Sequence, residues 1–178
     1  LTINLMLIRL LLYAGTFSAD PWLIPWIHLL LWIFATPALV ILGDSITDGY
    51  GVQPDTNMRW PDRLFERMQA APETRNIAVL NAGIGGNRLR LDGLGPNALA
   101  RFDRDVLSVP GVSHLIVIEG VNDFGTLTRD APATPEQHAA LVREMIEGLR
   151  QIVARARAHN IKAIGGTIMP YGGSAYYH

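Results

Sequence analysis

The sequence predicts an α/β fold with a parallel sheet covered by helices on both faces. Short apolar runs at residues 38–42, 77–80, 115–118 and 161–168 have the length and composition of buried strands. Between them lie longer segments in which apolar residues recur every three or four positions, as in amphipathic helices. Strands that alternate with helices along a chain form right-handed crossovers and a parallel, doubly wound sheet.

The composition fits one globular domain and excludes several classes of site. The chain has 178 residues, of which 49% are hydrophobic and 17% charged, so it can form a sizeable core. The absence of cysteine excludes disulfides, cysteine-based zinc sites and a thiol nucleophile. The net charge is −1 and there is no basic stripe, so nucleic acid is not an expected partner.

Residues 1–37 differ from the rest of the chain and are treated as a separate segment from residues 38–178. Two apolar runs in it are each shorter than the ~20 residues that span a bilayer, and Arg9 is costly at a membrane centre. One interpretation is a signal-like or membrane-associated segment, with membrane contact through residues 1–34. The other is a remnant of unrelated origin. Secretion or membrane association is slightly favoured over the cytoplasm, and the sequence does not define an oligomeric state.

Three amphipathic helices are expected, at residues 60–71, from Pro96 onward, and from Thr134 to about His159. The third begins with a threonine, a proline and, at the third helical position, a glutamine, which together form a capping box. Asn160 suits the left-handed position that ends such a helix. In the second helix, the charged residues are expected on the solvated side; these are Arg101, Asp103, Arg104 and Asp105.

Each of the first three strands ends in a glycine-rich polar cluster, and the carboxyl ends of parallel strands converge on one crevice. Ser45, in the first cluster, provides a hydroxyl nucleophile and a backbone N–H group. Gly86, in the second, provides a backbone N–H, and Asn122, in the third, a side-chain amide donor. Acyl transfer needs a nucleophile and donors aimed at the developing oxyanion, so the three residues are expected to share one site.

Each cluster also has a purely structural interpretation. Asp44, Ser45 or Thr47 can simply cap a helix, residues 85–86 can form a tight turn, and residues 122–123 an Asx turn. A dinucleotide-binding fingerprint that begins at Gly83 would need glycine at position 88, where the chain has Arg88.

The three clusters resemble, in the correct order, the first three sequence blocks of the SGNH hydrolases, also called GDSL esterases or lipases. The matching segments are residues 43–49 (GDSITDG), 81–88 (NAGIGGNR) and 120–123 (GVND). The similarity extends from about Ala38 to Tyr177, and segments 59–62, 100–106 and 170–173 resemble a bacterial branch of the family. The resemblance implies an α/β/α sandwich with a five-stranded parallel sheet.

The same resemblance implies a serine hydrolase that acts on small-molecule carboxylic esters through an acyl-enzyme, with no metal or organic cofactor. It implies that Ser45 is the nucleophile and an oxyanion donor, and that Gly86 and Asn122 are the other donors. Three neighbours within the same blocks are expected to contact substrate; they are Asp44, Asn87 and Asp123.

The general base of this family is a histidine that follows an aspartate three positions earlier. None of the five histidines has such an aspartate; they are His28, His114, His138, His159 and His178. We therefore expect an SGNH domain that stops before its last block, lacks the last strand, and has little or no activity as it stands. The alternative is a non-catalytic binding protein that keeps the crevice without its general base.

Overall fold

The computed structural model of the chain describes residues 36–173, so the expectations for the N-terminal apolar segment lie almost wholly outside the described residues. Within residues 36–173, no helix combines the length and the apolar character needed to cross a bilayer.

Four parallel strands form the sheet, in the order β2-β1-β3-β4. They are β1 (Ala38–Gly43), β2 (Ala78–Gly83), β3 (Val112–Ile118) and β4 (Lys162–Gly165). β1 is central and buried along its whole length. In the ladder, Gly43 lies opposite Gly83 on one side and Ile118 on the other, so β1, β2 and β3 end at the same level. The segments that follow these three strands therefore begin side by side.

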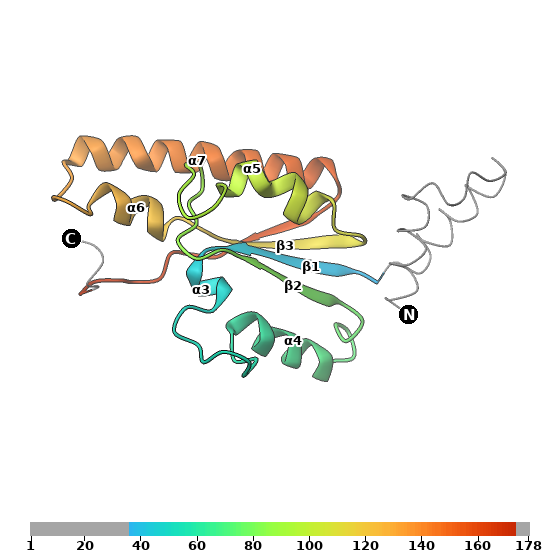
Figure 1. Cartoon of the computed structure of the whole chain (residues 1–178). Helices are drawn as coiled ribbons and strands as arrows, with labels where there is room; N and C mark the ends of the chain where they lie inside the picture. Colours follow the sequence, from blue (N-terminus) through green and yellow to red (C-terminus); the bar gives the residue numbers. More distant parts are fainter. Residues whose placement is uncertain (1–35, 174–178) are drawn as a thin grey trace, which may run out of the picture.

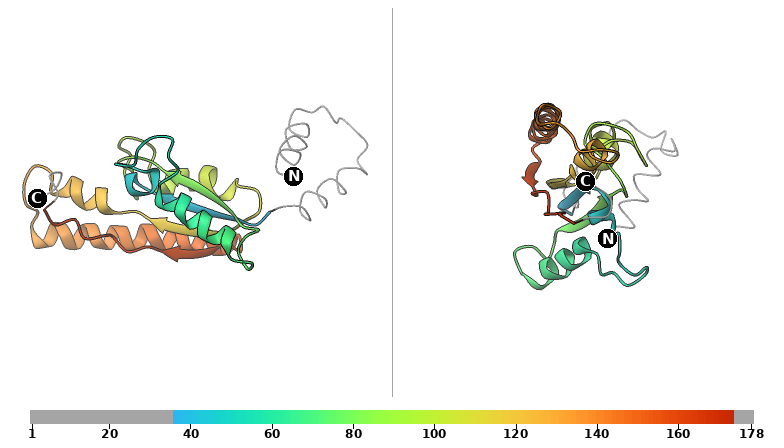
Figure 2. Two further views of the ribbon diagram at one scale, coloured as in Figure 1. Left: turned by 90° about the horizontal axis from the view of Figure 1, so that it is seen from below. Right: turned by 90° about the vertical axis from the view of Figure 1, so that its left-hand side faces the viewer.

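Helices cover both faces of the sheet, which confirms the predicted three-layer architecture (Figure 1). One face carries α4 (Trp60–Ala70). The other carries α5 (Ala98–Phe102), the π-helix η1 (Asp103–Leu107), α6 (Val121–Leu127) and α7 (Pro135–Ala158). The end-on view in Figure 2 separates these two layers. A single turn of helix, α3 (Ser45–Asp48), lies at the carboxyl end of β1.

The main core lies between the sheet and the layer formed by α5, η1 and α7. Phe102, Val106, Ile152 and Ala156 from these helices pack with buried residues of β1 and β3. The predicted capping box of α7 is confirmed, because Thr134 Oγ1 accepts from the N–H of Gln137 (3.3 Å) while Gln137 Oε1 accepts from the N–H of Thr134 (2.8 Å).

The predicted end of α7 is confirmed too, because Asn160 has the left-handed φ of 58° just after the helix. Two residues of the predicted apolar stripe of α7, Val142 and Ile146, are exposed, so the buried stripe is narrower than predicted.

Several boundaries differ from the prediction. β2 continues to Gly83 because its last residues pair with the end of β1, and β4 ends at Gly165. The second helix begins at Ala98, with Asn97 as its N-cap. The short helix α6 was not predicted, and a helix at α3 was predicted only as the alternative in which Asp44, Ser45 or Thr47 is a cap. Four and seven residues are too few to show a periodic apolar pattern.

Candidate active site

Ser45 is the first residue of α3, directly after the central strand. The Asp44 side chain caps this turn by accepting from the N–H of Ile46 (2.9 Å). Gly43 is required at the end of β1, because a Cβ there would lie 2.2 Å from Thr47 Oγ1. The helix-cap interpretation of this segment therefore holds for Asp44, and it leaves Ser45 at the carboxyl edge of the sheet.

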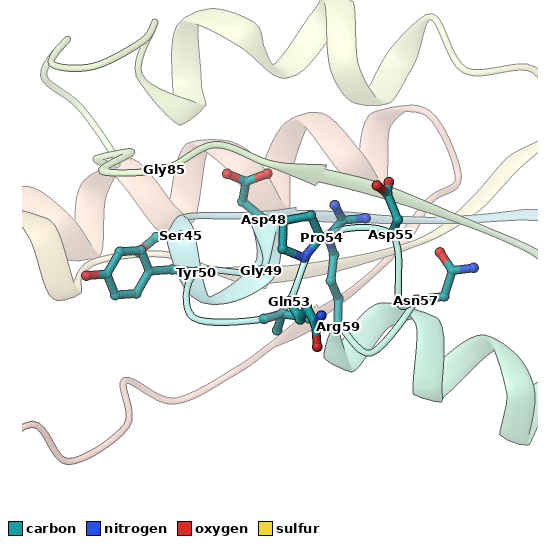
Figure 3. Close-up of a pocket in the computed structure, with 11 residues that line it drawn as sticks. Ser45, Asp48, Gly49, Tyr50, Gln53, Pro54, Asp55, Asn57, Arg59 and Gly85 are labelled. Atoms are coloured by element: carbon teal, nitrogen blue, oxygen red, sulfur yellow. The ribbon is translucent and has the colours of Figure 1, made fainter.

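Ser45 lines a surface pocket of about 330 Å³. In Figure 3, Ser45 and Tyr50 lie at one end of this pocket and Asp55 and Asn57 at the other. Most of the lining comes from the segment between α3 and α4, and it is rich in hydrogen-bonding side chains. The lining residues are Ser45, Asp48, Gly49, Tyr50, Val52, Gln53, Pro54, Asp55, Asn57, Arg59 and Gly85.

The second cluster forms a tight turn beside Ser45. The N–H of Asn87 donates to the carbonyl of Ile84 (3.1 Å), and Gly86 has a φ of +69°, the left-handed value that a type II turn requires at its third position. The N–H of Ile84 donates to the carbonyl of Gly43 (3.0 Å), which ties this turn to the end of β1. Gly85 lines the same pocket as Ser45.

The third cluster is joined to the second by a side-chain hydrogen bond. Asn122 lies in the first turn of α6, and its Nδ2 donates to the carbonyl of Asn87 (2.8 Å). The clusters that contain Ser45, Gly86 and Asn122 are thus linked by hydrogen bonds at the carboxyl ends of the strands.

The three residues expected to contact substrate are instead buried and bonded within the protein. Asp44 caps α3, and the Asp123 carboxylate accepts from the N–H of Leu89 (3.0 and 3.2 Å). The Asn87 side chain donates to the carbonyl of Pro96 (2.8 Å). These side chains hold the strand ends and turns together, and their contact with substrate stays a prediction.

Arg101 is a buried charged residue that the sequence analysis placed wrongly. It was expected on a solvated helix face, but it is only 2% exposed. Its guanidinium bonds groups from four parts of the chain that meet beneath the crevice. These are Asn87 Oδ1 (3.0 and 2.9 Å), the carbonyls of Gly43 (3.0 Å) and Ala82 (2.6 Å), Asp105 Oδ2 (3.0 Å) and Glu119 Oε1 (3.2 Å).

Three acidic groups and one guanidinium are the charged groups buried in the described part of the chain, namely Asp44, Glu119, Asp123 and Arg101. Burial, reinforced by the charge of Asp44 and opposed by Arg101, raises the pKa of Glu119 from 4.5 to about 8. Burial also raises the pKa values of Asp44 and Asp123. Glu119 is therefore mainly protonated at neutral pH, which keeps a third negative charge away from those of Asp44 and Asp123.

The histidines of the described region have partners of their own. His114 Nδ1 lies 3.0 Å from Ser113 Oγ near the amino end of β3, at the opposite edge of the sheet. The His138 ring stacks on Phe124, and His159 Nδ1 lies 2.9 Å from the carbonyl of Arg155. Among residues 36–173, no cluster of three or more His, Asp or Glu side chains is arranged to hold a metal ion.

Comparison with known proteins identifies the family of this chain. Residues 41–178 match the model of the GDSL-like lipase/acylhydrolase family. The chain therefore belongs to that family, as the three sequence blocks predict. No curated protein matches the chain.

Two solved structures with this fold illustrate the similarity at more than 25% identity. A G-D-S-L family lipolytic protein from Desulfitobacterium hafniense is 26% identical, with a TM-score of 0.55 over 76% of this chain and 62% of that one. A variant of the acetyl xylan esterase Axe2 from Geobacillus stearothermophilus is 28% identical, with a TM-score of 0.52 over 74% and 59%.

AlinE4, an SGNH-hydrolase family esterase, is 21% identical with a TM-score of 0.57, over 80% of this chain and 65% of that one, and supports the fold alone. The chain thus spans 59–65% of the length of these three structures.

Proposed function

We propose that this chain carries the nucleophile and the oxyanion-binding part of a serine hydrolase that acts on carboxylic esters. The observation that carries the proposal is the convergence of the three strand-end clusters. The end of β1 is bonded to the turn that contains Gly86, and that turn is bonded to Asn122. Membership of an acylhydrolase family and the esterase neighbours support the same reaction class.

In the proposed reaction, Ser45 Oγ attacks the ester carbonyl carbon and loses its proton to a general base. The resulting oxyanion accepts hydrogen bonds from the backbone N–H groups of Ser45 and Gly86 and from Asn122 Nδ2, and such donors are usually the largest single contribution to catalysis. The alcohol then leaves with the proton, which produces an acyl-enzyme. Water, deprotonated by the same base, hydrolyses the acyl-enzyme and regenerates the Ser45 hydroxyl.

The size and the lining of the pocket beside Ser45 favour a small, polar substrate group. Its volume of about 330 Å³ is at the lower end of the usual range for ligand pockets, and Gln53, Asp55 and Asn57 add hydrogen-bonding groups at its rim.

The second candidate is a binding protein that keeps the crevice but does not hydrolyse its ligand. It is favoured by one observation, the absence of an Asp-x-x-His sequence from these 178 residues. Without a base, Ser45 is a weak nucleophile at neutral pH, although an intact oxyanion site can retain ~10³–10⁴-fold catalysis over water.

The test is covalent labelling of Ser45 in the full chain by 4-nitrophenyl acetate, with the acetylated residue located by peptide mass spectrometry. We expect acetylation at Ser45 that is absent from Ser45→Ala. Ser113→Ala is the matched control, because Ser113 lies beside a histidine but at the other edge of the sheet. Acetylation that proceeds at the same rate in Ser45→Ala would refute the proposed nucleophile, and labelling without release of acetate would favour the second candidate.

A further inference from the structure

We propose that Arg101 and Glu119 form a proton-controlled positioning pair, which fixes the turn that carries Gly86 and the Asn122 amide in place. Neither side chain lines the pocket beside Ser45, so both would act through other residues. This inference rests on the proposed function, because it concerns the placement of the donors assigned there to the oxyanion.

Asn87 transmits the effect of Arg101 to both donors. Its Oδ1 accepts two bonds from the guanidinium, from Nε (3.0 Å) and from one terminal nitrogen (2.9 Å). Its carbonyl accepts from Asn122 Nδ2 (2.8 Å), and its N–H follows directly after Gly86 in the turn. A planar guanidinium that bonds one acceptor twice fixes orientation as well as distance. A shift of Arg101 would therefore displace both proposed donors.

The terminal nitrogen that bonds Asn87 has more acceptors than hydrogens. The same nitrogen of Arg101 lies 3.0 Å from the carbonyl of Gly43, 2.9 Å from Asn87 Oδ1 and 3.2 Å from Glu119 Oε1. A guanidinium NH₂ group carries only two hydrogens. These three acceptors therefore compete, and their relative strength decides how firmly Arg101 holds the turn.

The protonation state of Glu119 decides this competition. Asp44 from the start of α3, Asp123 from α6 and Arg101 from α5 are the charged groups that act on Glu119. Glu119 Oε2 is buried and has no hydrogen-bond partner, so ionisation leaves a poorly solvated charge whose main bonded counterion is Arg101. A carboxylate is a stronger acceptor than an amide oxygen. Ionised Glu119 would therefore draw the guanidinium away from Asn87.

Asp105 keeps Arg101 neutralised while Glu119 is protonated. Asp105 Oδ2 lies 3.0 Å from another nitrogen of the guanidinium, and its hydrogen bond to Arg104, followed by that to Arg101, lowers the pKa of Asp105. The burial that raises the pKa of Glu119 to about 8 puts the exchange at mildly alkaline pH. The donors are thus best held in place below that pH and lose their positioning above it.

The experiment is an NMR titration of the uniformly ¹³C,¹⁵N-labelled full chain between pH 5.5 and 9.5. We expect the Glu119 carboxyl carbon to titrate with a midpoint near 8, and the Gly86 amide and Asn122 side-chain signals to follow that midpoint. In Glu119→Gln, these two signals should stay at the positions they have at low pH in the native chain. Glu144→Gln, which removes an exposed glutamate paired with Arg90, is the matched control and should behave like the native chain.

The functional readout is the rate of Ser45 acetylation in each variant divided by the rate in the native chain at the same pH. This ratio removes the general effect of pH on the nucleophile, which is the same in both proteins. The ratio of Glu119→Gln to native should rise above pH 8. Arg101→Met should lower the rate by about 10²-fold, the cost of losing one oxyanion donor. Arg101→Lys keeps the charge without the planar fork and should recover part of the lost rate. Arg150→Met, which removes an exposed arginine paired with Glu147 on α7, is the matched control and should have no effect.

Two results would overturn the inference. One is a Glu119 titration that leaves the Gly86 and Asn122 signals unmoved. The other is an unchanged pH response of those signals in Glu119→Gln. If Arg101→Met does not fold, Arg101→Lys and Glu119→Gln still decide the question. Failure of the proposed function has a different signature, since Ser45 would then not be acetylated even though the NMR signals still follow Glu119.

Discussion

Replacement of Gly83 by alanine should move the turn that carries Ser45. A Cβ at Gly83 would lie 2.3 Å from the backbone nitrogen of Asp48, 2.7 Å from the carbonyl carbon of Thr47 and 2.8 Å from the Asp48 Cα. All three are backbone atoms of α3, so no side-chain rotation relieves the overlap. Packed interiors have no spare room for an added methyl group, so the overlap must be relieved by movement of the backbone. We expect α3 to move away from the end of β2 by about 1 Å.

The expected cost follows from that displacement. Overpacking of this kind destabilises a domain by about 1–3 kcal/mol. A displacement of about 1 Å in a catalytic group can lower a rate by about 10²-fold. We therefore expect Gly83→Ala to show both effects in urea denaturation and in the rate of Ser45 acetylation.

Two glycines provide matched controls. At Gly85, two residues along the same segment, a Cβ would meet only Asp48 Oδ2 at 3.6 Å, an ordinary contact with a flexible side chain. At Gly165, it would meet nothing within 4 Å. Both variants should stay within about 0.5 kcal/mol of the native chain. Native-like acetylation in Gly83→Ala would refute the claim that the end of β2 positions Ser45.

The remaining predictions concern the core, a helix cap and pH. Ile152→Ala, at a fully buried position of α7, should cost about 2–5 kcal/mol in urea denaturation, while Ile146→Ala, at a 43% exposed position of the same helix, should cost under about 0.5 kcal/mol. Thr134→Ala removes the hydroxyl of the capping box and should cost about 1 kcal/mol by the same measurement; an unchanged midpoint would mean that the cap does not contribute. The pKa of Glu119 is about 8 in the folded protein and 4.5 without its environment, so the folded state binds this proton more tightly. The stabilisation that the bound proton gives to the folded state is complete below pH 4.5 and is lost as pH rises through 8. Stability measured from pH 5 to 9 should therefore fall by a few kcal/mol more in the native chain than in Glu119→Gln, and equal slopes would contradict the assignment.

The sequence predicts the sheet and the long helices well because their signals are local. β1 is a continuous apolar run, and α7 has both a cap and a periodic stripe. Val142 and Ile146 belong to that stripe but are exposed, since the 3-4 spacing does not show how wide the covered face is. The positions of Ser45, Gly86 and Asn122 after successive strands follow from the topology, because parallel strands end at a common edge.

Arg101 could not be placed from its own segment. It lies among Asp103, Arg104 and Asp105, an alternation of charges that is typical of an exposed helix face. Its burial depends on Asn87 and Glu119, which are 14 and 18 residues away in sequence. The burial of Asp44, Asn87 and Asp123 could not be predicted for the same reason. Their polar side chains satisfy buried backbone groups, and their own sequence segments do not show this.

The most direct test of the proposed site is a crystal structure of the chain after reaction with a 4-nitrophenyl alkylphosphonate, whose phosphonyl group resembles the tetrahedral intermediate. We expect a covalent bond from Ser45 Oγ to phosphorus. We also expect the phosphonyl oxygen to lie about 2.7–3.1 Å from the backbone nitrogens of Ser45 and Gly86 and from Asn122 Nδ2. A phosphonyl oxygen directed into solvent, or an adduct on another residue, would contradict the proposed site.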